Sequence, residues 1–159
     1  MRFHLVDRIV EVIPSRSIRA LKNLTLGEDY LADHFPTFPV MPGVLMLQTL
    51  VETATWLLRV TDEFRHSVIT LREAKGVKYG SFMEPGRQMQ IAVDLTEQEE
   101  RSAWFKGKGE VEGQSVVAAR FCLTRYNLKE RNRALESTDE RIVKQQRELY
   151  SLLKGDLAV

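Results

Sequence analysis

A proline-rich segment followed directly by a long apolar segment constrains the fold of this chain more than any other feature. Three prolines fall within residues 34–43, and residues that precede proline are pushed toward extended backbone. We therefore predict a stiff loop here and not a helix. Residues 44–60 then carry apolar side chains on more than one face of a predicted helix, which is typical of a buried helix.

The rest of the chain is dominated by strand patterns. Apolar and polar residues alternate strictly over residues 89–95, as in a half-buried strand. A Gly-containing turn at residues 112–114 predicts a hairpin. The expected strands are 17–26, 67–71, 76–82, 89–95, 104–110 and 115–125, and residues 5–13 are apolar with interspersed charge. One buried helix among these strands predicts an α+β fold in which a curled antiparallel sheet wraps one long central helix.

The last part of the chain differs in composition. Ser137 and Glu140 resemble a capping box, the following apolar residues have helical spacing, and Gly155 is a plausible helix stop. We expect one domain over residues 1–126 and a charged extension with an amphipathic C-terminal helix over 127–159. Packing of this helix on its own domain is the default expectation, and binding of a partner is the alternative.

Composition excludes several classes of protein. The 159 residues carry a net charge of +1, which gives no reason to expect a nucleic-acid partner. Cys122 is the only cysteine, so neither an intrachain disulfide nor a cysteine-based zinc site is expected. The N-terminus has no apolar signal-peptide core, and no apolar run approaches the roughly 20 residues of a membrane span. We therefore expect a cytoplasmic protein without a membrane span.

His34 is the main candidate for chemistry. It opens the stiff loop that leads into the N-terminus of the predicted helix. A helix N-terminus offers unpaired backbone N–H groups that suit a carbonyl oxygen or an oxyanion. Gly43 lets a ligand approach the backbone, and histidine is a common general base near neutral pH. The bland alternative is a loop histidine without a catalytic role.

A longer motif favours the catalytic interpretation. The string His34-Phe35-Pro-x-x-Pro39-x-Met41-Pro42-Gly43-Val44-Leu45 resembles the signature of bacterial β-hydroxyacyl-(acyl-carrier-protein) dehydratases. Shorter strings similar to that family lie at residues 5–8, 20–25, 77–79, 85–87 and 105–108. The resemblance covers roughly residues 5–125 and spares the C-terminal extension. It implies a hotdog fold, homodimers that often assemble as trimers of dimers, and no cofactor.

The resemblance also implies a mechanism in fatty acid biosynthesis. A 3-hydroxyacyl chain, linked through phosphopantetheine to acyl carrier protein, loses water to give a trans-2-enoyl thioester. His34 would be the base that removes the proton next to the thioester carbonyl, and the N–H of Gly43 would polarise that carbonyl. A carboxylate from the central helix of the other subunit would assist departure of the hydroxyl. Residues expected to contact the substrate are Phe35, Phe38, Met41, Pro42, Val44 and Gln48.

The chain departs from the family pattern at the carboxylate. The family's catalytic acid lies fourteen residues after the histidine, where this chain has Gln48. One helical turn later, where many members have glutamine, it has Glu52. Positions i and i+4 share a helix face, so Glu52 is the candidate replacement acid, and burial should raise its pKa. The alternative is that Glu52 only hydrogen-bonds Gln48 and that dehydration is lost.

Three functions compete at this point. The first is a carrier-protein-dependent dehydratase. The second is a catalytically silent hotdog subunit or acyl-binding module, which the amide of Gln48 favours. The third is a hotdog thioesterase, which the dehydratase-type loop disfavours.

Overall fold

The structure of the chain is a computed structural model that describes residues 4–156, so three residues at each end lie outside the described part. Its six strands form one antiparallel sheet in the order β1-β2-β4-β5-β6-β3. The strand bounds are β1 Arg8–Ile13, β2 Ser17–Asn23, β3 Val68–Tyr79, β4 Gln88–Gln98, β5 Ser102–Val111 and β6 Gln114–Tyr126. This order leaves β1 and β3 at the two edges of the sheet.

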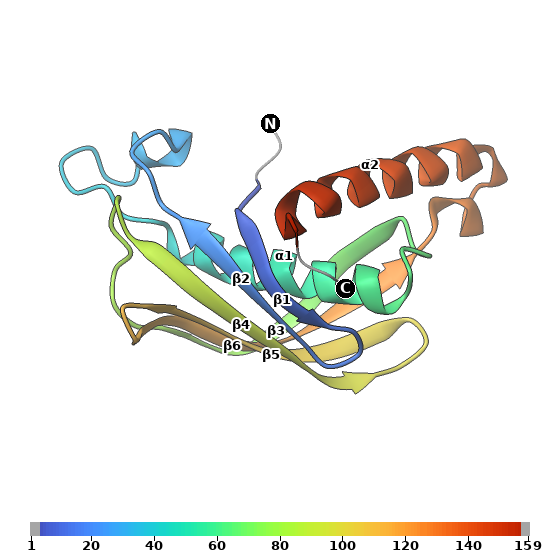
Figure 1. Cartoon of the computed structure of the whole chain (residues 1–159), viewed down its shortest axis with the longest axis horizontal. Helices are drawn as coiled ribbons and strands as arrows, with labels where there is room; N and C mark the ends of the chain where they lie inside the picture. The colour runs from blue at the N-terminus through green and yellow to red at the C-terminus, as the bar shows by residue number, and fades with distance from the viewer. Residues whose placement is uncertain (1–3, 157–159) are drawn as a thin grey trace.

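The central helix α1 spans Gly43–Thr61 and lies against the concave face of the curled sheet (Figure 1). Leu50, Leu57 and Leu58 on this helix are fully buried in the core. The sheet approaches α1 closely at Gly107 of β5, where an added Cβ would lie 3.3 Å from a methyl carbon of Leu50. The α+β hotdog arrangement, with one long helix inside a curled antiparallel sheet, is therefore confirmed.

The second helix, α2, spans Glu136–Lys154 and follows two short 3-10 turns, η2 Leu128–Glu130 and η3 Arg133–Leu135. Another 3-10 turn, η1 Asp29–Leu31, precedes the proline-rich loop. The ring of Tyr150 on α2 lies 6.1 Å from Trp56 and 5.5 Å from Phe64, measured between centroids. The C-terminal helix therefore packs on its own domain, as expected from the sequence.

Two details of the secondary structure differ from the sequence-based expectation. The segments expected at 67–71 and 76–82 are joined in one strand, β3, which ends at Tyr79 and whose pairing with β6 is interrupted by irregularities on either side of Glu73–Lys75. The gap expected between them is absent, and Gly76, with φ +58, lies within the strand. Ser137 does not cap α2 either, because η3 runs directly into the helix and places Ser137 in its first turn.

Asp139, in the first turn of α2, bonds the segment that precedes the helix. Its carboxylate accepts hydrogen bonds from the backbone N–H groups of Leu128 and Lys129, both at 2.9 Å, and from the hydroxyl of Ser67. These three donors come from η2 and from the start of β3. A single buried carboxylate thus joins α2 to the segment before it and to the sheet.

None of the helices within residues 4–156 is both long enough and apolar enough to cross a membrane.

Candidate functional site

His34 is held in one orientation by its own loop. Its Nδ1 lies 2.9 Å from the carbonyl oxygen of Val40, and the backbone N–H of Val40 donates to the carbonyl of His34 at 3.0 Å. A carbonyl oxygen only accepts hydrogen bonds, so Nδ1 carries the proton in this contact. The other ring nitrogen, Nε2, is then an unprotonated base in the neutral imidazole. The ring is half-buried and stacks on Phe35.

The loop leads into the N-terminus of α1, and Val40, which bonds His34, lies three residues before Gly43. Pro42 precedes the helix, and no side chain caps its first turn. The first N–H groups of a helix have no partner within the helix. The ring of Tyr79, at the end of β3, lies over Gly43, where an added Cβ would come within 3.0 Å of a ring carbon. Glycine at this position therefore lets the aromatic ring close over an uncapped helix terminus.

Apolar side chains surround this terminus on the outside. Phe35, Phe38, Val44, Tyr79 and Phe82 are all exposed, and Phe38 meets Phe82 edge to face at 5.6 Å. Five exposed apolar side chains near the uncapped N-terminus of α1 are typical of a binding surface.

The other two loop residues expected at the site lie differently. Pro42 is half-buried. Met41 is buried in the hydrophobic core, and its backbone N–H donates to the carbonyl of Met83. Met41 therefore supports the loop from within the core.

Gln48 and Glu52 lie on one face of α1, as their spacing predicts. Both line a groove of about 650 Å³ between α1 and α2. Gln48 is exposed and Glu52 is half-buried. Glu52 Oε2 accepts a hydrogen bond from the backbone N–H of Leu5 at 2.9 Å. The partner of Glu52 is thus the N-terminal segment and not Gln48, contrary to the alternative expected from the sequence.

Burial raises the pKa of the Glu52 carboxyl above its usual range. The hydrogen bond from Leu5 and the positive charge of Lys22 oppose this effect, and the negative charge of Asp7 adds to it. Because burial outweighs the opposing contributions, a larger fraction of Glu52 is protonated at a given pH than for a carboxyl in water. A protonated carboxyl can donate a proton to a leaving group.

His34 and Glu52 of one chain do not form a single cluster. Glu52 lies nine residues after Gly43 on α1, which is a rise of about 13 Å along the helix. His34 lies in the loop that precedes Gly43, farther still from Glu52 along the chain. Groups this far apart cannot act together on two adjacent carbon atoms of one substrate.

Three groups of residues that shape the surface around Gly43 and the groove at Glu52 were not predicted from the sequence. The N–H of Leu5 holds Glu52 across 47 residues of sequence, and no local pattern encodes that contact. Tyr79 covers Gly43, and its only signal was the family-like string at residues 77–79. No sequence feature indicated that residues of α2 line the groove, because the family resemblance ends before this helix.

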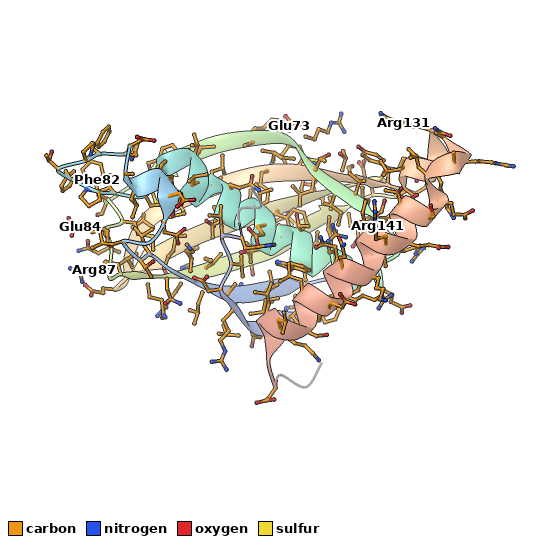
Figure 2. All side chains as sticks on the ribbon, turned by 90° about the horizontal axis from the view of Figure 1, so that it is seen from above. Glu73, Phe82, Glu84, Arg87, Arg131 and Arg141 are labelled. Atoms are coloured by element: carbon orange, nitrogen blue, oxygen red, sulfur yellow. The ribbon has the colours of Figure 1, made fainter. Side chains whose placement is uncertain are left out.

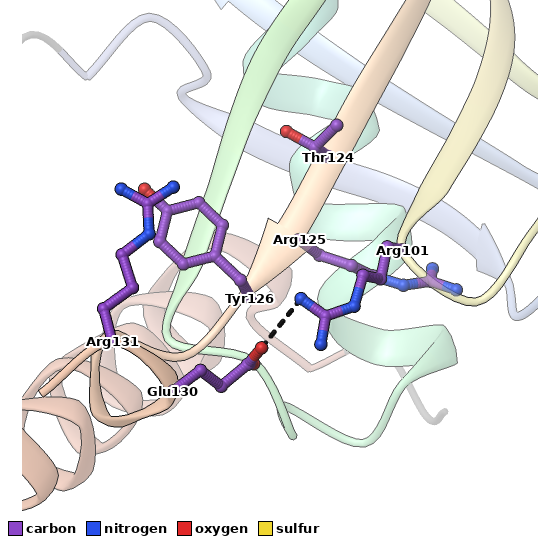
Figure 3. Close-up of a pocket in the computed structure, with 6 residues that line it drawn as sticks. All are labelled: Arg101, Thr124, Arg125, Tyr126, Glu130 and Arg131. Atoms are coloured by element: carbon purple, nitrogen blue, oxygen red, sulfur yellow. Dashed lines mark ion pairs between the residues drawn. The ribbon is translucent and has the colours of Figure 1, made fainter. Parts of the chain in front are cut away.

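A second concave surface lies where β5 begins and β6 ends (Figure 3). Arg101 pairs with Glu130 at 2.8 Å, and the guanidinium of Arg131 stacks over Tyr126. Arg125 is buried and bonds the carbonyls of residues 99 and 100. The arginine side chains of this surface therefore already interact with groups of the protein, so nothing here indicates a ligand-binding site.

Comparison with known proteins gives a consistent picture. A model of the FabA-like domain family matches residues 1–120. The 3-hydroxyacyl-[acyl-carrier-protein] dehydratase FabZ of Dechloromonas aromatica is 33% identical over 130 residues, which cover 79% of this chain and 90% of the relative. FabZ of Burkholderia thailandensis is 38% identical over 124 residues, covering 76% and 77%.

Solved structures support the fold. The dehydratase heterocomplex ApeI:P from Xenorhabdus doucetiae matches with a TM-score of 0.66 at 14% identity, covering 84% of this chain and 90% of that one. An HP0420 homologue from Helicobacter felis matches with a TM-score of 0.59 at 10% identity, covering 77% and 79%. At these identities the likeness concerns the fold alone.

Proposed function

The chain belongs to the FabA-like family of β-hydroxyacyl-(acyl-carrier-protein) dehydratases, and from that membership we propose that it dehydrates 3-hydroxyacyl thioesters carried by acyl carrier protein in fatty acid synthesis. The observation that carries this proposal is the geometry of His34. Its Nδ1–H donates to the carbonyl of Val40 beside the uncapped start of α1. An oriented base next to a terminus that can bind an oxyanion is what elimination from a thioester requires.

His34 is the base in the proposed reaction. Its Nε2 takes the proton from the carbon next to the thioester carbonyl, and the electron pair of that C–H bond becomes the new carbon–carbon double bond. Negative charge develops on the thioester oxygen as the proton leaves. The N–H of Gly43, at the positive end of the α1 dipole, stabilises that oxygen.

Glu52 is the proposed acid. The bond between the third carbon and its hydroxyl breaks, and the hydroxyl takes the carboxyl proton of Glu52 and leaves as water. The step converts neutral His34 and protonated Glu52 into an imidazolium and a carboxylate. Return of one proton from His34 to Glu52 through solvent resets the site. The raised pKa of Glu52 favours this role, because the carboxyl must be protonated when the reaction starts.

The acid and the base come from two subunits in this proposal. β3 is a twelve-residue edge strand that pairs only with β6 in the described part of the chain. Such an edge readily pairs with a second copy. Antiparallel pairing of two β3 strands carries the loop of one copy toward the other copy's groove, because Tyr79 covers Gly43 at one end of β3 and Ile69 borders the groove at the other.

The proposed partners follow from the same assembly. Acyl carrier protein supplies the substrate on its pantetheine arm, and the working unit is a homodimer that can assemble further into a trimer of dimers. The exposed apolar residues Phe35, Phe38 and Val44 lie beside the proposed site. They contact the acyl chain or the second subunit in this arrangement.

One assay tests the proposal. The protein is incubated with a 3-hydroxyacyl chain on acyl carrier protein, and the enoyl thioester is followed by its ultraviolet absorbance. Formation of the enoyl product supports dehydration, and release of the free acid indicates a thioesterase instead. Because elimination is reversible, the enoyl substrate is also supplied, and hydration is measured.

The second candidate function is a subunit that binds acyl chains without turning them over. Two observations favour it: an amide at Gln48 in place of the family carboxylate, and the bond that ties Glu52 to its own chain at Leu5. Binding of the hydroxyacyl carrier protein without either product would support this function over the dehydratase.

A further inference from the structure

The groove between α1 and α2 has one wall that lies outside the residues matched by the family model. α1 contributes Gln48, Glu52, Thr55 and Trp56. α2 contributes Ile142, Gln145, Gln146, Glu148, Leu149 and Leu152. The C-terminal helix is thus part of the same cavity as the proposed acid, although the family resemblance assigns it no role.

The lining of this groove is rich in hydrogen-bonding groups. Gln48 of α1 and Gln146 of α2 both line the groove, and neither amide makes a hydrogen bond within residues 4–156. An alkyl chain in this position would remove both amides and Glu52 from water without replacing their hydrogen bonds, which is unfavourable. The ligand that fits the groove must bring donors and acceptors of its own.

A cation extends the groove toward one end of α2. Arg141 lies four residues before Gln145 and seven before Glu148, so it shares their stripe on the helix. Arg141 is exposed and makes no ion pair with any residue that the structure describes. It projects from α2 near the start of β3 (Figure 2). A free positive charge therefore lies on α2 just outside the residues that line the groove, near the start of β3.

The acidic groups of the groove lie away from this cation. Glu148 is seven residues from Arg141, about 10 Å along the helix. Glu52 bonds Leu5 in the N-terminal segment, next to His4, which also lines the groove. The groove is thus positive at the Arg141 end and has its carboxyl groups farther along.

We propose that this groove binds the pantetheine arm of the substrate, with Gln48 and Gln146 hydrogen-bonding the amides of the arm and Arg141 pairing with its phosphate. The proposal rests on the proposed function, because it takes carrier-linked thioesters as the substrates. A pantetheine arm has two amides, each with a donor and an acceptor, and ends in a phosphate. Its thioester end then lies toward Glu52, where the proton is needed.

The first test compares substrates that contain or lack the arm. kcat and KM are measured for one 3-hydroxyacyl group on coenzyme A and on N-acetylcysteamine, which keeps one amide and has no phosphate. Arg141→Ala should raise KM for the coenzyme A thioester about tenfold and leave KM for the truncated thioester unchanged. Gln146→Leu should raise KM for the coenzyme A thioester about fivefold, with kcat nearly unchanged.

The matched control is Lys144→Ala, which removes an exposed cation of the same helix that does not line the groove. This variant should behave as the wild type toward both thioesters. Equal effects of Arg141→Ala and Lys144→Ala would mean that only net charge matters and would overturn the phosphate contact. Equal effects of Gln146→Leu on both thioesters, or on neither, would overturn the proposed path of the arm.

The second test does not need turnover. Binding of free coenzyme A is measured by calorimetry for the wild type, Arg141→Ala and Lys144→Ala. Weaker binding only in Arg141→Ala supports the groove even if the wild type produces no enoyl thioester, in which case only the proposed function has failed. Binding of coenzyme A that is the same in all three proteins refutes the groove as the site of the arm.

Discussion

At the scale of single residues, the proposed site depends on two hydrogen bonds that hold the proposed base and the proposed acid in different ways. The bond from His34 to Val40 spans six residues and fixes which ring nitrogen is basic. The bond from Leu5 to Glu52 spans 47 residues and orients a carboxyl whose pKa is raised by burial. The local motif was enough to predict the position of His34, because the prolines and Gly43 determine the path of that loop. The environment of Glu52 depends on tertiary packing, so the sequence predicted only the direction in which its pKa is shifted.

The first prediction concerns His34. His34→Ala removes the proposed base, so enoyl formation should fall by about 10²–10⁴-fold. The side chain is half-buried in an exposed loop, so the free energy of unfolding should change by no more than about 0.5 kcal/mol. Enzyme kinetics and urea unfolding are measured together, with His66→Ala as the control for loss of an imidazole elsewhere. Near-wild-type turnover by His34→Ala would show that the histidine is structural.

The second prediction concerns the exchange of Gln48 and Glu52. Glu52→Gln should lose most of the activity while binding of a substrate analogue persists, because an amide holds a hydrogen bond but does not supply an acidic proton. Gln48→Glu in the Glu52→Gln background restores the family arrangement and should recover activity. Enoyl formation is compared for the wild type, both single variants and the double variant. If Glu52→Gln is as active as an active wild type, another group assists departure of the hydroxyl.

The third prediction follows from the raised pKa of Glu52. A carboxyl whose pKa is higher in the folded than in the unfolded protein stabilises the fold below its unfolded pKa, near 4.5, and this contribution is lost as the pH rises through the folded pKa. The free energy of unfolding of the wild type should therefore fall relative to Glu52→Gln as the pH increases across that interval. Urea unfolding at a series of pH values measures the difference. A difference that stays constant with pH would contradict a raised pKa.

At the scale of elements, alternation and helical spacing predicted most of the strands and both helices, and local breaks were overestimated. Met89, Ile91 and Val93 are buried on one face of β4, as their alternation predicts. The gap expected between residues 71 and 76 is absent, because β3 continues through it and its pairing with β6 resumes after each irregularity. The start of α2 was also misplaced, because η3 runs directly into the helix and Asp139 in its first turn bonds residues ten and eleven positions earlier in the chain. Such contacts are set by tertiary structure and leave no local signal.

The fourth prediction concerns that carboxylate. Burial alone would raise the pKa of Asp139, but hydrogen bonds from Ser67, Lys129 and Leu128 outweigh it and lower the pKa below the usual value. Asp139→Ala leaves these three donors without their acceptor and should reduce the free energy of unfolding by about 3 kcal/mol. Hydrogen exchange should then show faster opening of α2 than of α1.

The same carboxylate predicts a dependence on acid. A lowered folded pKa gives stability that is complete above the unfolded pKa, near 3.8, and is lost as the pH falls through the folded pKa. The wild type should therefore lose stability over this acid interval, and Asp139→Ala should lose less. Asp139→Ala that matches the wild type in hydrogen exchange and in acid unfolding would show that other contacts hold α2.

At the scale of the whole molecule, the two edges of the sheet differ. β1 is six residues long, whereas β3 is twelve residues long and lies beside both the loop terminus and the groove. Leu71 on β3 is exposed although it pairs with a core residue, Leu123, on β6. A long edge with exposed apolar side chains next to two half-sites is explained by pairing with a second copy. The family resemblance predicted a dimer, and we propose that the β3 edge forms it.

The last prediction tests whether the site is shared between subunits. His34→Ala and Glu52→Gln proteins are each expected to be nearly inactive, because every site in either homodimer lacks one group. When the two are mixed and allowed to exchange subunits, half of the dimers are mixed, and each mixed dimer has one site with both groups intact. Since a two-fold dimer holds two equivalent sites, the mixture should recover about a quarter of wild-type turnover.

Substitutions on the two edge strands provide the control for this recovery. Leu71→Lys places a charge on that edge and should weaken the dimer and abolish the recovery, whereas Ile13→Lys, an exposed apolar residue on the other edge strand, should do neither. Sedimentation velocity reports the oligomeric state, and enoyl formation reports the recovery. A mixture that stays inactive although its subunits exchange would mean that His34 and Glu52 do not meet across the interface, and a monodisperse monomer would refute the shared site altogether.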